Sequence, residues 1–225
     1  MSKRRIEEEE ESDIDINSTD SVNFHALKNL LRQLIGEDAK ALNLSAITDL
    51  VLEAPTTTIK TDGKESDPYA FLSAINFKDV KSNDYFKYIH KSDSDLSSYL
   101  NKISNKKNAL LLSERLINMP IQVIPAIYKI VLEEAEKSEG TKYDNYLIPS
   151  RKYEVNDEVD ENSSKRIKTV EVDFYHHEDK FLEINAKFFT KLEGKHGIIQ
   201  TFILIDHQGL EKAIEQLEEA IAAAF

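Results

Sequence analysis

Apolar residues recur along this chain with two different periods, which predict helices near both ends and strands between them. From residue 24 to residue 35 they follow the spacing of one helix face, and Gly36 supplies the residue that ends such a helix. A second helix is expected from Ser45, as its N-cap, to just before Pro55. A third apolar stripe, from Leu210 to Ile221, excludes the glutamates between its members and predicts an amphipathic C-terminal helix.

The middle of the chain is dominated by runs of β-branched and alternating apolar residues. We expect strands at residues 56–60, 69–77, 109–118, 143–155, 169–175, 187–192 and 198–205, and short helices at 84–90, 96–103, 126–137 and 177–185. The strands outnumber the long helices and several are consecutive. The predicted fold is therefore α/β of the α+β kind, a mixed and mostly antiparallel central sheet flanked by helices. One domain is expected over residues 21–225, with a mobile loop near residues 156–166.

The first 20 residues differ from the rest in composition. They carry three basic and eight acidic residues and so contribute −5 to a net charge of −12, which predicts a disordered acidic tail. The tail could serve solubility alone or contact a basic client through Glu7, Glu8, Glu9, Glu10, Glu11, Asp13 and Asp15. A basic cluster at the start of the tail is either a nuclear-import patch or a chance grouping, and consists of Lys3, Arg4 and Arg5.

Charge and composition exclude several classes of function. An acidic protein repels the phosphates of nucleic acids and of anionic membranes, so neither is expected as a direct partner. The absence of cysteine excludes disulfides, thiolate nucleophiles and cysteine-ligated metals. No apolar run reaches the roughly 20 residues that a membrane-spanning helix needs, so no membrane insertion is expected.

The turn at residues 119–125, between a predicted strand and helix, is where an α/β enzyme would hold a phosphate-bearing cofactor. Such a cradle needs free backbone N–H groups and usually glycine. There is no glycine between Asn108 and Lys137, while Pro120 and Pro125 each remove a donor. Pro125 suits the first turn of the following helix, so no cofactor is expected here.

Two charges interrupt the apolar strand before that turn. Strand alternation places Glu114 on one face and Arg115 on the other, so they cannot form one catalytic pair. Each of the two charged side chains could find its polar partners in neighbouring strands or loop backbone, or could line a groove for a partner protein.

A second group of polar residues, at 176–179, consists of two histidines followed by two acids. Adjacent histidines make a poor chelate, so no metal is expected. A turn entering a helix with an acidic first turn is the preferred interpretation.

Several stretches together resemble the BCP family, called BCCIP in animals. They extend from about residue 22 to the C-terminus, and the run Glu114, Arg115, Asn118, Met119 and Pro120 is the most specific of them. The others are Asn23-Phe24-His25 with Leu27, Leu30 and Leu31; Asp67 to Leu72; Tyr146 with Ser150 to Tyr153; Glu178-Asp179 with Leu182-Glu183; and Thr201 to Asp206 with Gly209-Leu210.

The resemblance implies a fold like that of the GCN5-related N-acetyltransferases, in a family not known as enzymes. It implies a nuclear chaperone and transport adaptor that shuttles to the cytoplasm, shields a basic ribosomal protein of the large subunit and supports nuclear export of a phosphoinositide kinase. No catalytic residue is implied. Whether Lys165, Arg166 and Lys168 add to nuclear import stays open. The alternative is a divergent acetyl-CoA-dependent acyltransferase, which the fold alone would suggest.

Overall fold

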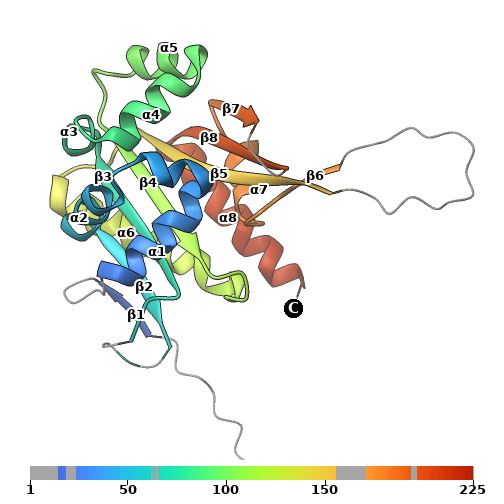
Figure 1. The fold of residues 1–225 in the computed structure, drawn as a ribbon. Helices are drawn as coiled ribbons and strands as arrows, with labels where there is room; N and C mark the ends of the chain where they lie inside the picture. Colours follow the sequence, from blue (N-terminus) through green and yellow to red (C-terminus); the bar gives the residue numbers. More distant parts are fainter. Residues whose placement is uncertain are drawn as a thin grey trace, which may run out of the picture.

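In the computed structural model, a single mixed sheet carries helices on both of its faces (Figure 1). The structure describes residues 15–18, 24–61, 63, 66–155, 171–193 and 197–224. Within them the sheet has eight strands in the order β1-β2-β3-β4-β5-β8-β7, and β6 pairs with β5 outside this path.

The strands are β1 (Asp15–Ser18), β2 (Thr56–Lys60), β3 (Ala70–Asn76), β4 (Asn108–Arg115), β5 (Asn145–Val155), β6 (Glu171–Phe174), β7 (Phe188–Glu193) and β8 (Ile198–Asp206). The α-helices are α1 (Phe24–Ile35), α2 (Leu44–Glu53), α3 (Phe77–Val80), α4 (Asp84–Ser92), α5 (Ser94–Lys102), α6 (Ile124–Glu139), α7 (Asp179–Ile184) and α8 (His207–Ala224). Two 3-10 turns are η1 (Gly36–Ala41) and η2 (Ile121–Val123).

Only β4 and β5 pair in parallel, and every other neighbouring pair in the described sheet is antiparallel. The parallel pair is joined by a crossover that contains α6 and returns the chain to the same end of the sheet. The predicted mixed and mostly antiparallel sheet is confirmed.

The parallel pair is short, and the two strands then separate. β4 and β5 are paired only from Asn108 and Asn145 to Leu110 and Leu147. Further along β5 the same edge is taken by β6, from Lys152 to Val155, while β8 holds the opposite edge along nearly its whole length. We call the gap between the diverging ends of β4 and β5 the wedge.

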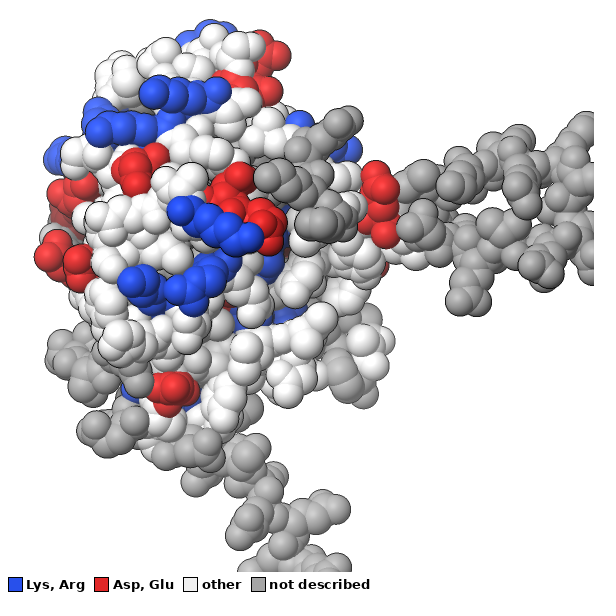
Figure 2. All heavy atoms as spheres, in the orientation of Figure 1, with Lys and Arg blue, Asp and Glu red and all other residues white. Residues whose placement is uncertain are grey.

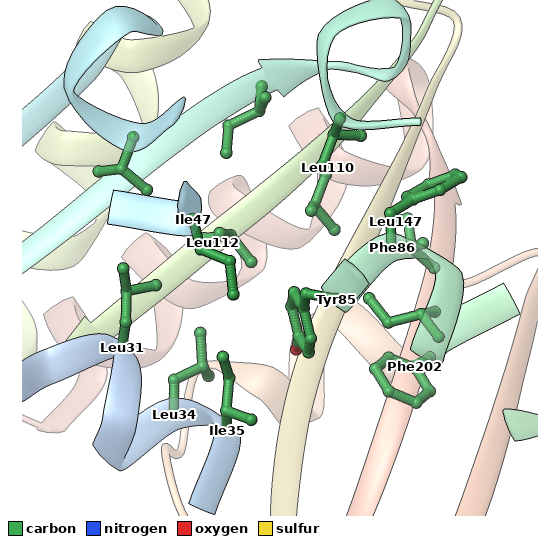
Figure 3. Packing of buried hydrophobic residues seen from close by; sticks show 14 of the residues in the cluster. Leu31, Leu34, Ile35, Ile47, Tyr85, Phe86, Leu110, Leu112, Leu147 and Phe202 are labelled. Carbon is green, nitrogen blue, oxygen red and sulfur yellow. The ribbon is translucent and has the colours of Figure 1, made fainter. Parts of the chain in front are cut away.

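Strand alternation divides the core into two layers. On one face, Leu110 and Leu112 of β4 join Leu147 and Phe202 beneath α1, α2 and α4 (Figure 3). On the other face, Ala109 and Leu111 of β4 lie beneath α6, α7 and α8. Leu217, a member of the predicted C-terminal stripe, is one of the α8 residues in this layer. Each β4 side chain is therefore committed to one layer, which is why a charge in this strand needs a partner on its own face.

Several predicted boundaries are corrected by local hydrogen bonds. The cap of α2 is Asn43, whose side chain accepts from the Ala46 N–H, whereas the Ser45 hydroxyl accepts from Lys28. β4 ends at Arg115 instead of residue 118, because the chain turns there and Met119 N–H donates to the Leu116 carbonyl. α6 starts at Ile124, two residues earlier than expected, with Pro125 in its first turn as predicted.

The expected disordered tail needs one correction. Residues 15–18 form β1, which pairs antiparallel with β2 from Asp15 opposite Lys60 to Ser18 opposite Thr57. An edge strand thus begins inside the segment assigned to the tail. The rest of the tail, the loop near 156–166 and Lys165, Arg166 and Lys168 lie outside the described residues.

Among the described helices, none combines the length and apolar character needed to cross a membrane.

Candidate functional site

The two charges at the end of β4 lie in the wedge, and the rest of their sequence motif does not. Glu114 and Arg115 are buried, at 0% and 6% exposed, while Asn118 and Pro120 are exposed on the turn that follows. The structure therefore divides the motif into an interior pair of charges and a turn in which Asn118 and Pro120 are exposed and Met119 is buried.

Glu114 is held on the face of the sheet covered by α1. Its carboxylate pairs with the Arg151 guanidinium of β5 and accepts from His176 Nε2 at 2.7 Å and from Gln33 Nε2 of α1 at 3.1 Å. Arg151 in turn donates to the Gln33 carbonyl at 2.6 Å and lies over the Tyr175 ring, 4.0 Å from its centroid. This buried carboxylate thus ties a helix, two strands and the chain after β6 together.

Arg115 is held on the opposite face, as the alternation predicts. Its Nε and Nη2 donate to the two oxygens of Glu178 at 2.9 and 3.0 Å, which is a bidentate pair. Its Nη1 donates to the Met119 carbonyl at 3.1 Å. Burial would raise the pKa of Glu178, but hydrogen bonding and charge attraction from Arg115 outweigh it and hold this pKa below its usual value.

Each of the two charges has one partner in the same short segment, residues 175–179, which passes through the wedge from one face to the other. The Tyr175 N–H donates to the Arg151 carbonyl, at the edge of β5 that β4 has left. His176 then meets Glu114 on one face, and Glu178 meets Arg115 on the other. The segment therefore fills the opening between the diverging strands.

Asp179 closes the inner end of this segment at the start of α7. Its Oδ2 accepts from the Ser150 hydroxyl of β5 at 2.5 Å. Burial, reinforced by the negative charge of Glu178, raises the pKa of Asp179 to about 7, although His176 and the Ser150 hydroxyl act in the opposite direction. The wedge therefore contains a carboxyl group that titrates near neutral pH.

The position of this network decides what it can do chemically. In open α/β sheets, ligands enter the crevice beyond the carboxyl ends of parallel strands. Here that crevice is filled by Glu114, Arg115, Arg151, His176, Glu178 and Asp179, each at most 7% exposed. Both guanidinium groups are already paired with carboxylates of the chain itself, so the arrangement is suited to holding the sheet and the segment together.

The turn at residues 119–125 is closed in a similar way. The Met119 N–H donates to Leu116 at 3.0 Å and the Val123 N–H donates to Pro120 at 3.4 Å, so two of its donors are used internally. Pro125 occupies the first turn of α6, and Arg115 holds the Met119 carbonyl. Few N–H groups are left for an anion.

The described residues contain no cluster of three or more side chains suited to a metal ion. His176 and His177 lie in a turn before α7, with Asp179 in the first turn of that helix, as the sequence interpretation expects.

Sequence reasoning did not identify Arg151, His176 and Glu178 as the partners of the β4 charges. These residues are 37 to 63 positions from their partners, and no periodicity links such distant residues. The one available signal was that Arg151 and Glu178 belong to the family-like stretches.

Comparisons with known proteins agree on one family. The BCCIP family model matches residues 11–182. Protein BCP1 of Candida glabrata is 44% identical, over 98% of this chain and 95% of its own length, and Protein BCP1 of Saccharomyces cerevisiae is 48% identical, over 89% and 78%. A crystal structure of BCP1 from Saccharomyces cerevisiae superposes with a TM-score of 0.80 at 45% identity and covers 95% of this chain and 94% of that one.

Proposed function

Because the chain belongs to the BCCIP family, we propose that it is a non-enzymatic chaperone and transport adaptor of the nucleus that shuttles to the cytoplasm. Its client is a basic ribosomal protein of the large subunit, which it binds and shields. It also supports nuclear export of a phosphoinositide kinase together with the export machinery.

The observation that carries the non-enzymatic part of the proposal is the filled wedge. A cofactor-dependent acyltransferase needs an open site beside the central strands. Here residues 175–179 occupy the wedge. They are held by the buried ion pair of Arg115 with Glu178 and by the hydrogen bond of His176 to Glu114, which is itself paired with Arg151. Opening it would leave buried charges without partners, which costs several kcal/mol.

The acidic balance of the chain supports a basic client. The net charge is −12, and five consecutive glutamates, Glu7–Glu11, form its densest run of one sign. Attraction between such a run and a client rich in lysine and arginine is long-ranged at low salt and is screened over about 8 Å at physiological ionic strength. Binding through the tail should therefore weaken as salt rises.

A salt titration with matched variants tests the client proposal. The purified full chain is mixed with a basic ribosomal protein of the large subunit, and Kd is measured from 50 to 400 mM NaCl. We expect saturable binding that weakens with salt, and a shallower salt dependence when Glu7–Glu11 are replaced by Gln.

The control variant removes five negative charges elsewhere, so that its net charge equals that of the tail variant. It replaces exposed glutamates that form no ion pair within the described part of the chain: Glu53, Glu136, Glu154, Glu215 and Glu219. If wild type shows no saturable binding even at 50 mM NaCl, the client proposal fails. If the two variants have the same salt dependence, the tail has no specific part in binding.

The acyltransferase alternative is tested separately by calorimetry with acetyl-CoA. A filled wedge and a turn with few free N–H groups predict no heat of binding up to millimolar ligand. Saturable binding in the micromolar range would contradict the non-enzymatic proposal.

A further inference from the structure

A second feature, at the end of the sheet opposite the wedge, is a cleft between α3, α4, α5 and the loop that enters β4. Its volume is about 620 Å³, within the range of roughly 300–1,000 Å³ that small-molecule sites occupy. Phe77 and Phe86 lie at its apolar side, with ring centroids 4.9 Å apart in an edge-to-face contact.

The charge of this cleft is opposite to that of the whole chain. Four lysines and one glutamate line it, which leaves a formal charge of +3 in a protein of net charge −12. The lysines are Lys78, Lys81, Lys106 and Lys107, and the glutamate is Glu139. Figure 2 shows Lys and Arg side chains gathered over α3 and α4.

None of the four lysines forms an ion pair with another described residue, whereas Lys129, Lys142 and Lys187 elsewhere on the surface each pair with a carboxylate. Like charges gathered around one cleft repel each other, so their grouping is unfavourable until an anion neutralises them. We call this group the lysine cleft.

The backbone that carries two of these lysines is held in place without using their ammonium groups. The Lys106 N–H donates to the Ile103 carbonyl at 2.9 Å, and the Lys107 N–H donates to Asp144 Oδ2 at 2.8 Å. Asn108 Nδ2 donates to the carbonyls of Ile103 and Lys106. These hydrogen bonds hold the loop backbone in place, and the exposed side chains of Lys106 and Lys107 are left to contact a ligand.

We propose that the lysine cleft binds a small anion bearing two or more phosphate groups, either free in solution or as the headgroup of a phosphoinositide lipid. Lysine ammonium groups bind phosphate oxygens as compact point charges, and several lysines lining one cleft favour a multiply charged ligand over a single phosphate. Exposed amides of Asn101 and Asn105 add hydrogen-bond donors at the rim. This site is independent of the proposed client binding.

The two sources of the phosphate groups are distinguished by two assays on the full chain. Calorimetry with tripolyphosphate at 50 mM NaCl tests a free ligand. Co-sedimentation with phosphatidylcholine vesicles containing 5% phosphatidylinositol 4,5-bisphosphate, against phosphatidylcholine alone, tests the headgroup. We expect one saturable site per chain in at least one assay, and binding in only one of them identifies the source.

A charge-matched pair of variants ties the binding to the cleft. Replacing Lys106 and Lys107 by Gln should weaken binding about tenfold, since two ligand–lysine contacts are lost. Replacing Lys180 and Lys212 by Gln should change the Kd by less than about twofold. These two lysines are exposed on α7 and α8 and lie outside the cleft. Urea unfolding of both variants should match wild type, because all four side chains are exposed. Absence of binding in both assays, or equal losses in the two variants, would overturn the proposal.

Discussion

At the scale of single residues, Glu114 is the side chain on which the wedge depends most. It is fully buried and contacts a guanidinium from β5, an imidazole from the segment after β6 and an amide from α1. A carboxylate in such a position is stable only while all of these donors are present.

Replacing Glu114 with Ala should therefore lower the free energy of unfolding by about 3 to 5 kcal/mol, because Arg151 would be left buried without its counter-charge. Urea denaturation of the two proteins measures the difference. The matched control, Glu136→Ala, removes an exposed glutamate of α6 and should change stability by less than about 0.5 kcal/mol. A loss below about 1 kcal/mol for Glu114→Ala would show that the network contributes little to folding.

Asp179 links stability to pH. Its pKa is about 7 in the folded protein against an ordinary value of 3.8, so between these values the folded state binds more protons than the unfolded state. The stabilisation from protonated Asp179 is complete below about pH 4 and is lost as pH rises towards 7. Glu178, whose pKa is lowered, has the opposite sign and acts only in the acid range.

Asp179→Asn removes this titration. Compared with wild type, the variant should gain about 2 kcal/mol in relative stability when the pH is raised from 5 to 8. Urea unfolding of both proteins at the two pH values measures this change. A difference between the two proteins that does not depend on pH would show that Asp179 is already ionised at pH 5.

At the scale of elements, the chain approaches itself closely where the end of α7 meets the first turn of α8. A Cβ placed on Gly209 would lie 2.8 Å from the Asn185 carbonyl oxygen and 2.9 Å from Asp206 Oδ1. Asp206 also accepts from the Gly209 N–H at 2.8 Å, which holds the first turn of α8. α8 can pack this closely on the end of α7 only because residue 209 has no side chain.

Gly209→Ala should therefore destabilise the protein by about 1 to 3 kcal/mol, although alanine alone favours a helix over glycine by roughly 1 kcal/mol. Thermal or urea unfolding tests the sign. The neighbouring control, Gln208→Ala, changes an exposed side chain of the same turn and should have little effect. A stabilised Gly209→Ala variant would mean that the two helices can separate at no cost.

At the scale of the whole molecule, charge is distributed unevenly. The lysine cleft carries +3 at one end of the sheet, while the densest acidic run lies in the N-terminal residues. We expect the two to act independently, because the acidic run attracts a cationic client whereas the lysine cleft attracts an anion.

The variants already described test this independence. Lys106→Gln with Lys107→Gln should leave the Kd for the basic ribosomal protein within about twofold at 150 mM NaCl, and Glu7–Glu11→Gln should leave tripolyphosphate binding equally unchanged. Each constant is measured by calorimetry in its own titration, with wild type and the variant compared at the same salt concentration. A tenfold change in either Kd would show that the acidic residues and the lysine cleft affect each other's binding.

The extent to which the fold could be predicted follows from which interactions are local. The positions of most helices and strands were predicted because period and capping are properties of neighbouring residues. The opposite faces of Glu114 and Arg115 were also predicted, since alternation needs no tertiary information. The start of α2 was wrong because Asn43 and Ser45 are both good caps, and the choice depends on Lys28 taking the Ser45 hydroxyl.

By itself, the sequence determined the class of the fold, the amphipathic faces and the family, all of which are carried by local pattern or by motifs in order along the chain. Only the tertiary structure decided that β4 and β5 separate and that residues 175–179 pass between them, where His176 contacts Glu114 and Glu178 pairs with Arg115. It also decided that lysines from α3 and from the loop before β4 surround one cleft. These pairings join residues far apart along the chain, and such contacts are selected by packing of the whole sheet instead of by any local preference.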